Sequence, residues 1–199
     1  MQTDTYQTIA QFAEGTFKDR GSKFIGFAFE VTDEEDVKEK IQFIKKLHPT
    51  ARHVCYAYRI DPLNEKWRAN DDGEPASSAG KPILNQMKSV GVQNCLVAVV
   101  RYFGGTLLGV PGLIHAYKEA ANLALQAAGL KTKLITVQIE VVCPYAESGD
   151  LMKLIKQLQV DYKNDSTAEG FLLSAEIPFS EVEKFLSIVE EKGWLASRK

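Results

Sequence analysis

The chain contains 199 residues, of which 45% are hydrophobic and 25% are charged. This is the composition of a folded globular protein with one core or two small ones. The formal net charge of −2 and the lack of a basic tail do not indicate strong non-specific binding of nucleic acid. No apolar run reaches the roughly 18 residues of a membrane span, and the first residues do not resemble a signal peptide. We therefore expect a cytoplasmic protein with no membrane partner.

The first third of the chain predicts strands, a helix and a further strand. Residues 6–31 are expected to form two or three strands, and the apolar side chains that alternate along residues 25–31 share one face. Thr32 and Glu35 match a capping box at the start of a helix. The run HVCYAYRI, residues 53–60, is rich in β-branched and aromatic side chains and predicts a strand.

The three cysteines, Cys55, Cys95 and Cys143, are far apart and lie in apolar, strand-like contexts. This pattern predicts reduced thiols in the core and not a disulfide framework. His53 lies two residues before Cys55, but the chain has no CxxC or HxxxH pattern to complete a metal site. We therefore expect neither a metal nor a cofactor.

The segment DPLNEKWRANDDGEPASSAGK, residues 61–81, has no periodicity and predicts an unusually long loop, which in a compact domain is typically functional or disordered. It concentrates three carboxylates, Asp71, Asp72 and Glu74, around Gly73. These groups could bind a hard cation, or they could accept hydrogen bonds from the backbone of the loop itself. The second interpretation is favoured because the spacing of an EF-hand is absent.

The rest of the chain is organised around VVRYFGGTLLGVPGLIHAY, residues 99–117. The apolar residues 96–100 predict a central strand that is covered on both faces. A glycine-rich turn follows, and a helix is expected from near Gly112 to Gly129. Free backbone N–H groups at such a turn can hold an anion, although neither a P-loop nor a dinucleotide fingerprint is present. On the motif alone, close packing of the strand against the helix explains the glycines better.

The residues after Gly129 predict a second domain. The pattern gives a strand over 134–142, a helix over 145–158, two further strands, and a last helix capped by Ser180 and Glu183. This β-α-β-β-α order is that of a ferredoxin-like unit whose final strand is missing or very short. The short polar run LKTK separates it from the first domain. We therefore predict an α+β protein with two domains, residues 1–130 and 134–199.

The motifs RGSKF, HVCYAY, DDGEP, AGKPIL and VVRYFGGTLLG occur in this order, and with them the whole chain resembles the YigZ/Impact family. The resemblance implies an N-terminal domain like the second domain of a small-subunit ribosomal protein, which also occurs in translational GTPases. It implies a C-terminal domain like the last domain of the translocation factor. Eukaryotic relatives regulate initiation by competing for a ribosome-associated activator of an initiation-factor kinase, and a nucleic-acid-binding cleft has been suggested for bacterial members. The resemblance therefore implies a link to translation.

Two positions depart from the family pattern. The family usually reads DDGEPSGTAG, whereas this chain has Ala76, Ser77 and Ser78 after DDGEP. The family also usually reads GVGGLIRAY, whereas this chain has Pro111 and His115. Loss of that arginine makes any anion binding there weaker, or dependent on pH through the imidazole of His115.

Three hypotheses follow for the function. The leading one is a non-catalytic regulatory or binding protein in translation, with RNA, the ribosome or a translation-associated protein as partner. Its predicted anion or RNA site in the N-terminal cleft consists of cations and turn amides: Lys23, Lys81, Arg101, Gly104, Gly105, Thr106, His115 and Lys118.

The second hypothesis is an enzyme that acts on a phosphorylated or nucleotide ligand, with Asp71, Asp72 and Glu74 as metal ligands or general bases. No Ser, His and carboxylate triad is visible in the sequence. In the third hypothesis, the signature motifs stabilise the fold: the loop of Asp71, Asp72, Gly73, Glu74 and Pro75 caps its own amides, and Arg101 pairs with Asp71 and Asp72. The sequence alone does not separate the first hypothesis from the third.

Overall fold

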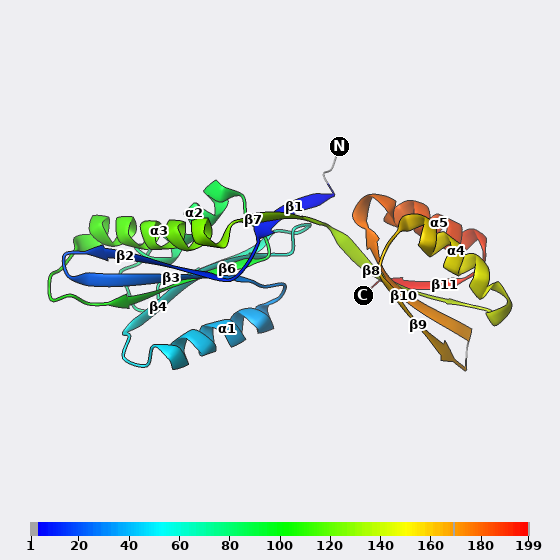
Figure 1. Cartoon of the computed structure of the whole chain (residues 1–199), viewed down its shortest axis with the longest axis horizontal. Coiled ribbons are helices and arrows are strands. Elements are labelled where there is room, and N and C mark those ends of the chain that lie inside the picture. The colour runs from blue at the N-terminus through cyan, green and yellow to red at the C-terminus, as the bar shows by residue number, and fades with distance from the viewer. Residues whose placement is uncertain (1–3, 169, 199) are drawn as a thin grey trace. The chain divides into compact units, whose positions relative to one another are not determined.

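The computed structural model describes residues 4–168 and 170–198, which divide into two compact units. The N-terminal unit is Tyr6–Lys133, and the C-terminal unit begins at Leu134 and includes Asp4 and Thr5. Both units are mixed α/β (Figure 1). The short strands β1 (Thr5–Ile9) and β7 (Leu130–Leu134) pair with each other.

A five-stranded sheet forms the middle layer of the N-terminal unit, with the strand order β2-β3-β6-β4-β5 and antiparallel neighbours throughout. The central strand, β6, is buried along residues 95–100, which confirms the expectation of a strand covered on both faces. The bounds are β2 (Ala13–Asp19), β3 (Ser22–Glu30), β4 (His53–Ile60), β5 (Lys66–Asn70) and β6 (Cys95–Tyr102).

Helices cover both faces of this sheet (Figure 1). α2 (Gly80–Val90) and α3 (Gly109–Ala128) pack on one face, where Phe24 and Cys55 belong to their core cluster. α1 (Glu34–Leu47) packs on the other face, which confirms the predicted alternation along residues 25–31. The alternating residues in that cluster are Ile25, Phe27, Phe29 and Val31.

Three sequence-based expectations in this unit are wrong in detail. The cap of α1 is Asp33 and not Thr32, because the Asp33 carboxylate accepts the backbone N–H groups of Glu35 and Asp36, each at 2.9 Å. Residues 61–81 are not a structureless loop, since they contain β5, an exposed strand that pairs with β4. The run LKTK is not a free connection but most of β7, whose Lys131 and Lys133 side chains both pair with the Glu30 carboxylate.

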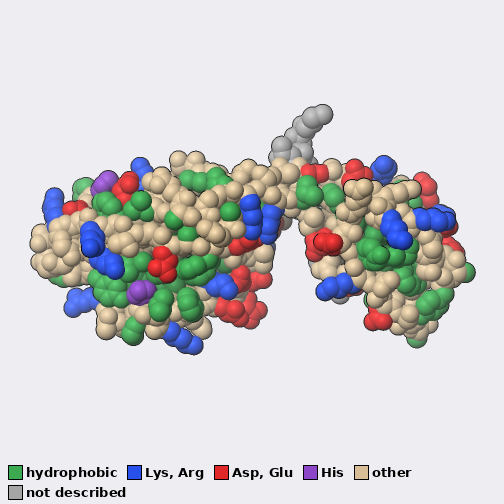
Figure 2. Space-filling model, in the orientation of Figure 1, with side chains coloured by type: hydrophobic (Ala, Val, Ile, Leu, Met, Phe, Trp, Pro, Cys, Tyr) green, Lys and Arg blue, Asp and Glu red, His purple; other side chains and the backbone are tan. Residues whose placement is uncertain are grey.

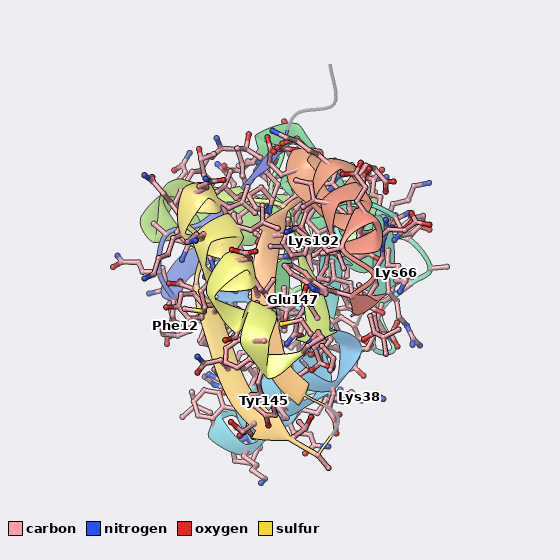
Figure 3. All side chains as sticks on the ribbon, turned by 90° about the vertical axis from the view of Figure 1, so that its right-hand side faces the viewer. Phe12, Lys38, Lys66, Tyr145, Glu147 and Lys192 are labelled. Atoms are coloured by element: carbon pink, nitrogen blue, oxygen red, sulfur yellow. The ribbon has the colours of Figure 1, made fainter. Side chains whose placement is uncertain are left out.

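In the C-terminal unit, one face of a four-stranded sheet carries two helices (Figures 1 and 3). The strand order is β11-β8-β10-β9, and the elements follow the chain as β-α-β-β-α-β. The final strand, expected to be missing or very short, is present with four residues. The bounds are β8 (Thr136–Cys143), α4 (Ser148–Leu158), β9 (Tyr162–Thr167), β10 (Gly170–Pro178), α5 (Val182–Glu191) and β11 (Leu195–Arg198).

The predicted cap of the last helix is also wrong. A 3₁₀ turn, Phe179–Glu181, precedes α5, so the position before the helix is Glu181, and no side chain caps it. The three cysteines are free and buried, as expected. Among the described residues, no helix is both long and apolar enough to cross a membrane. On the face shown in Figure 2, basic and acidic side chains are interspersed over both units.

Candidate functional site

Asp71 closes the signature loop onto the start of α2. Its Oδ1 accepts the backbone N–H groups of Ala79 at 3.0 Å and Gly80 at 2.8 Å, and its Oδ2 accepts that of Ser77 at 2.9 Å. Amides at the start of a helix have no partner within the helix, and a carboxylate acceptor satisfies them. Asp71 therefore has a structural role, and both of its oxygens are already in use.

Asp72 attaches the loop to the first residues of β4. Its Oδ2 accepts the backbone N–H of Val54 at 2.7 Å, and its Oδ1 lies 3.6 Å from Lys45 Nζ. The Nδ1 of His53 lies 2.7 Å from the backbone oxygen of Asp72. A carbonyl oxygen only accepts hydrogen bonds, so Nδ1 of His53 carries the proton, and Nε2 of the neutral ring has a free lone pair.

Glu74 is the centre of a buried polar chain. Its carboxylate side chain is 4% exposed, and Oε1 accepts hydrogen bonds from Arg101 Nη1 at 2.7 Å and from the Tyr117 hydroxyl at 2.8 Å. The single proton of the Cys55 thiol has two acceptors within reach, the backbone oxygen of Asp71 at 3.0 Å and the Tyr117 hydroxyl at 3.3 Å. Burial, aided by the neighbouring Cys55 and Glu74, raises the pKa of Tyr117 far above its usual range, and burial likewise raises the pKa of Cys55. Both groups therefore stay protonated and act as donors.

The three carboxylates of the loop thus hold the fold together. Each one accepts backbone N–H groups or pairs with a cation. Within residues 4–168 and 170–198, no group of three or more His, Cys, Asp or Glu side chains is placed to bind a metal. The expectation that Arg101 pairs with Asp71 and Asp72 is wrong, because the path of the loop brings Glu74 to the guanidinium instead.

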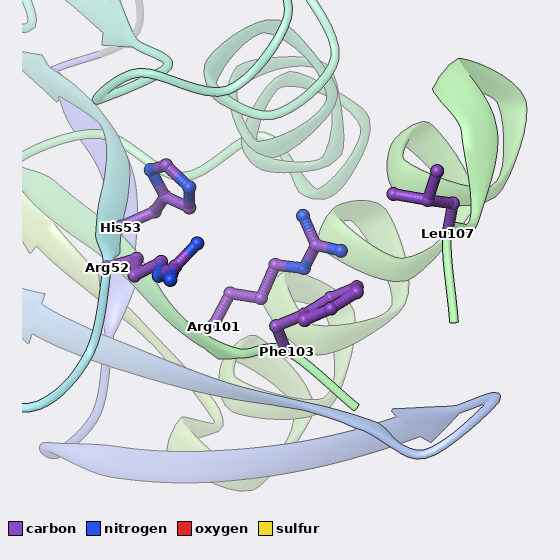
Figure 4. A pocket seen from close by; sticks show the side chains of 5 residues that line it. All are labelled: Arg52, His53, Arg101, Phe103 and Leu107. Carbon is purple, nitrogen blue, oxygen red and sulfur yellow. The ribbon is translucent and has the colours of Figure 1, made fainter. Parts of the chain in front are cut away.

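Arg101 also lines a pocket. Its guanidinium carbon lies 5.6 Å from the ring centroids of both Phe24 and Phe103, and its Nε is buried with no hydrogen-bond partner among the described residues. The pocket has a volume of about 240 Å³ and is lined by Arg52, His53, Arg101, Phe103 and Leu107 (Figure 4). We call it the Arg101 pocket.

The glycine turn beside this pocket is shaped by two different requirements. A Cβ on Gly104 would lie 1.9 Å from the carbonyl carbon of Gly21, so the two backbone segments approach each other too closely for a side chain. Gly105 has open space around it but a φ of +86°, which disfavours other residues. The Gly104 N–H donates to the Ser22 hydroxyl at 3.1 Å, so this amide does not face a ligand.

A second depression, which we call the lysine groove, lies between α2 and α3. It has a volume of about 540 Å³, and no carboxylate lines it. Lys81 and Lys118 line it, and neither forms an ion pair with any described residue. The other lining residues are Ser77, Pro82, Asn85, Gln86, Ser89 and Ile114.

The structure does not gather the predicted anion-binding residues into one site. Lys81 and Lys118 share the lysine groove, whereas Arg101 lies in the other pocket. Lys23 pairs with Tyr102 across β3 and β6, on the α1 side of the sheet. Gly105 and Thr106 are exposed in the turn next to Gly104. The ring of His115 packs edge-on against Phe17, with centroids 5.5 Å apart.

Three residues of the Arg101 pocket, Arg52, Phe103 and Leu107, were not singled out in the sequence, and His53 was considered only as a metal ligand. His53 and Arg101 are directly opposed in the register of β4 and β6. This register places the residue before β4 and the residues after β6 at the same end of the sheet, and no local pattern in the sequence indicated it.

Comparison with known proteins decides the family. The model of the Impact N-terminal domain matches residues 20–125. The IMPACT family member YvyE of Bacillus subtilis is 34% identical over 188 residues, which cover 94% of this chain and 81% of the relative. The chain belongs to the Impact family. This confirms the resemblance drawn from the signature motifs.

Solved structures extend this comparison. A crystal structure of a hypothetical protein aligns with a TM-score of 0.76 and 27% identity, over 98% of this Impact family chain and 97% of the other. A solved chain titled as the two-domain translational regulator Yih1 is 30% identical over 61% of this chain and 46% of that one. Its TM-score of 0.39 is too low for comparing the two folds.

Proposed function

We propose that this Impact family chain is a non-catalytic regulator in translation that acts by binding, in the cytoplasm, where translation takes place. Family membership supports the link to translation, and the relatives include a protein titled as a translational regulator. The engagement of Asp71, Asp72 and Glu74 within the fold supports binding over catalysis, since none of them is free to act as a base.

RNA is the partner that we propose, with its phosphates in the lysine groove. The single observation that carries this is that Lys81 and Lys118 line one groove with hydroxyl and amide side chains and without a carboxylate. Phosphate contacts supply most of the affinity in such sites, and polar side chains position the backbone. Arg101 is not part of this interface, because it lines the other pocket and not the lysine groove.

Fluorescence anisotropy with a short single-stranded RNA on the full chain tests this proposal. Binding should be modest and should weaken with salt, and Lys81→Ala and Lys118→Ala should each reduce the slope of log K against log salt by about 0.7. Lys38→Ala on α1 is the matched control, because Lys38 is exposed and lies outside the groove. Absence of binding at low salt, or equal effects of all three substitutions, would contradict the RNA proposal.

We also infer that the C-terminal unit is ferredoxin-like, supported by its β-α-β-β-α-β order and by a sheet in which its first and third strands are central. We also propose that the two predicted domains fold independently and, as the family resemblance implies, that the N-terminal one corresponds to the ribosomal-protein and GTPase type. A broad-specificity protease should cut near residue 135, between β7 and β8, or within residues 61–65, before β5, and leave stable fragments. Early cutting within residues 96–100 would contradict this division.

A further inference from the structure

The Arg101 pocket holds a buried arginine with most of its donors unused. The side chain is 9% exposed, and the hydrogen bond from Nη1 to Glu74 is the one that its guanidinium makes to described residues. Arg59, the other buried arginine, also leaves its Nε without a partner among the described residues, but it uses both terminal nitrogens, donating to the Val92 oxygen at 2.8 Å and to Glu65 at 2.6 Å. A guanidinium carries five N–H donors, and leaving them unpaired in a buried place is costly. An acceptor in the pocket would remove that cost.

The other polar side chains of the pocket indicate that this acceptor is an anion. Arg52 is exposed and forms no ion pair with any described residue, and no carboxylate lines the pocket. Figure 4 shows the Arg101 guanidinium between His53 and Leu107, with Arg52 next to His53 on the same side of the pocket. His53 is fixed by its bond to the backbone of Asp72, so its Nε2 is the atom left to meet a ligand, as an acceptor when neutral and a donor when protonated.

The apolar residues that line the rest of the pocket indicate which kind of molecule the anion belongs to. The Phe103 ring has the Arg101 guanidinium over it at 5.6 Å and is still 50% exposed, and Leu107 is 81% exposed. A half-exposed aromatic ring beside two arginines can stack a flat, partly apolar group. The volume of about 240 Å³ is below that of most pockets for whole ligands, so it suits a phosphate and part of a sugar.

We propose that the Arg101 pocket binds a nucleoside 5′-monophosphate unit, with its phosphate between Arg52 and Arg101 and its base on Phe103. This site is separate from the lysine groove, with which it shares no lining residue. The same chemistry has two sources, a free mononucleotide and the 5′-phosphorylated end of an RNA strand.

The test is titration of the full chain with adenosine 5′-monophosphate, followed by the amide and imidazole NMR signals of the pocket residues. AMP should shift the signals of Arg52, His53 and Phe103, and adenosine or inorganic phosphate alone should bind at least tenfold more weakly. Arg52→Ala should weaken AMP binding about tenfold or more, because a charge-assisted hydrogen bond to phosphate is lost. Phe103→Ala should weaken it about fivefold or more through loss of stacking.

Matched controls separate this proposal from general damage and from RNA binding. Arg68→Ala and Phe43→Ala replace an arginine and a phenylalanine that are equally exposed to solvent elsewhere, Phe43 being 52% exposed, and should leave AMP affinity unchanged. Lys81→Ala should also leave it unchanged, which keeps failure of the RNA proposal distinguishable from failure of this one.

A comparison of two oligonucleotides identifies whether the bound phosphate belongs to an RNA end or to a free mononucleotide. If the source is an RNA end, a 5′-phosphorylated oligonucleotide should bind more tightly than a 5′-hydroxyl one, and Arg52→Ala should remove that difference. If the source is a free mononucleotide, the two oligonucleotides should bind equally while the protein still binds AMP. The proposal is overturned if millimolar AMP leaves the pocket signals unmoved, or if the pocket variants and their controls bind AMP equally.

Discussion

In the N-terminal unit the sheet has helices on both faces, whereas in the C-terminal unit the helices lie on one face only. The central strand β6 accordingly shows no alternation, while β8 alternates between the apolar core and accessible polar side chains such as Gln138 and Glu140. A strand that is covered on both faces must be apolar along its whole length, whereas a strand that is covered on one face needs an apolar side chain only at every second position.

The same difference decides where buried polar groups occur. Among the described residues, every buried charged or polar side chain lies in the N-terminal unit, and these are Thr8, Ser22, Arg59, Glu74, Ser78, Asn94 and Arg101. The C-terminal core is apolar except for Cys143 and the indole N–H of Trp194, which donates to Glu147 at 2.7 Å. The signature residues Glu74 and Arg101 therefore lie in the unit in which polar groups are buried.

The largest expected effect comes from breaking the buried ion pair of the N-terminal unit. Glu74→Ala leaves the Arg101 charge buried and unpaired, which should destabilise the N-terminal unit by about 3–5 kcal/mol. Glu183→Ala removes the ion pair with Arg198 in the C-terminal unit, where the Glu183 side chain is 85% exposed, and should cost under about 1 kcal/mol. Urea unfolding, followed by the NMR signals of each unit, measures the loss of stability in both variants. Similar losses for Glu74→Ala and Glu183→Ala would contradict the difference between the two units.

The glycine turn should respond next most strongly. Gly104→Ala forces apart the backbone segments of Gly104 and Gly21 and should cost about 3 kcal/mol. Gly105→Val meets no neighbouring atom but needs a positive φ, which should cost about 1–2 kcal/mol. Thermal unfolding tests the order of the two, and an unchanged melting temperature for Gly105→Val would show that backbone geometry does not require that glycine.

A smaller effect is expected from Glu30, which holds β7 through Lys131 and Lys133. Burial by itself raises the pKa of Glu30, but the hydrogen bonds and charges of the two lysines outweigh it and lower the pKa below its usual range. The stabilisation is therefore complete above about pH 5, where an ordinary glutamate is ionised, and is lost as pH falls through the lowered pKa. Glu30→Gln should cost about 1 kcal/mol at pH 7 and nothing at a pH below the lowered pKa.

The exposed counterpart of Glu30 in the C-terminal unit is Asp150. Hydrogen bonds from Lys192 and Lys153 lower its pKa, but the Asp150 side chain is half exposed and solvent screens the charges. Asp150→Asn should therefore leave urea unfolding at pH 7 unchanged. A pH-dependent loss as large as that of Glu30→Gln would remove this distinction between the units.

The smallest expected effect is a gain in stability. Gly149 lies in the first turn of α4 and has no positive φ, and a Cβ added to it would have no other atom within 4 Å. Gly149→Ala should therefore stabilise the C-terminal unit by about 0.5 kcal/mol, because alanine loses less backbone entropy in a helix. A slightly raised melting temperature is the expected readout, and a lowered one would show that the position is constrained.

The sequence by itself determined the features that depend on neighbouring residues. The apolar run of β6, the alternation along residues 25–31, the buried thiols and the family motifs could all be predicted, because periodicity and composition are local properties. The helix start at Asp33 was missed by one residue, since adjacent Thr and Asp side chains both suit a cap. β5 was missed although Trp67 and Ala69 alternate with polar residues, because five mostly exposed residues give a weak signal and become a strand through pairing with β4.

The tertiary structure alone decided which groups meet. Glu74 is 27 residues from Arg101 and 43 from Tyr117 along the chain, and no local pattern indicated that it, and not Asp71 or Asp72, would reach the guanidinium. The same holds for the separation of Lys81 and Lys118 from Arg101 into two depressions. Contacts of this kind depend on strand register and on the path of the loop, which set distances between residues that the sequence leaves far apart.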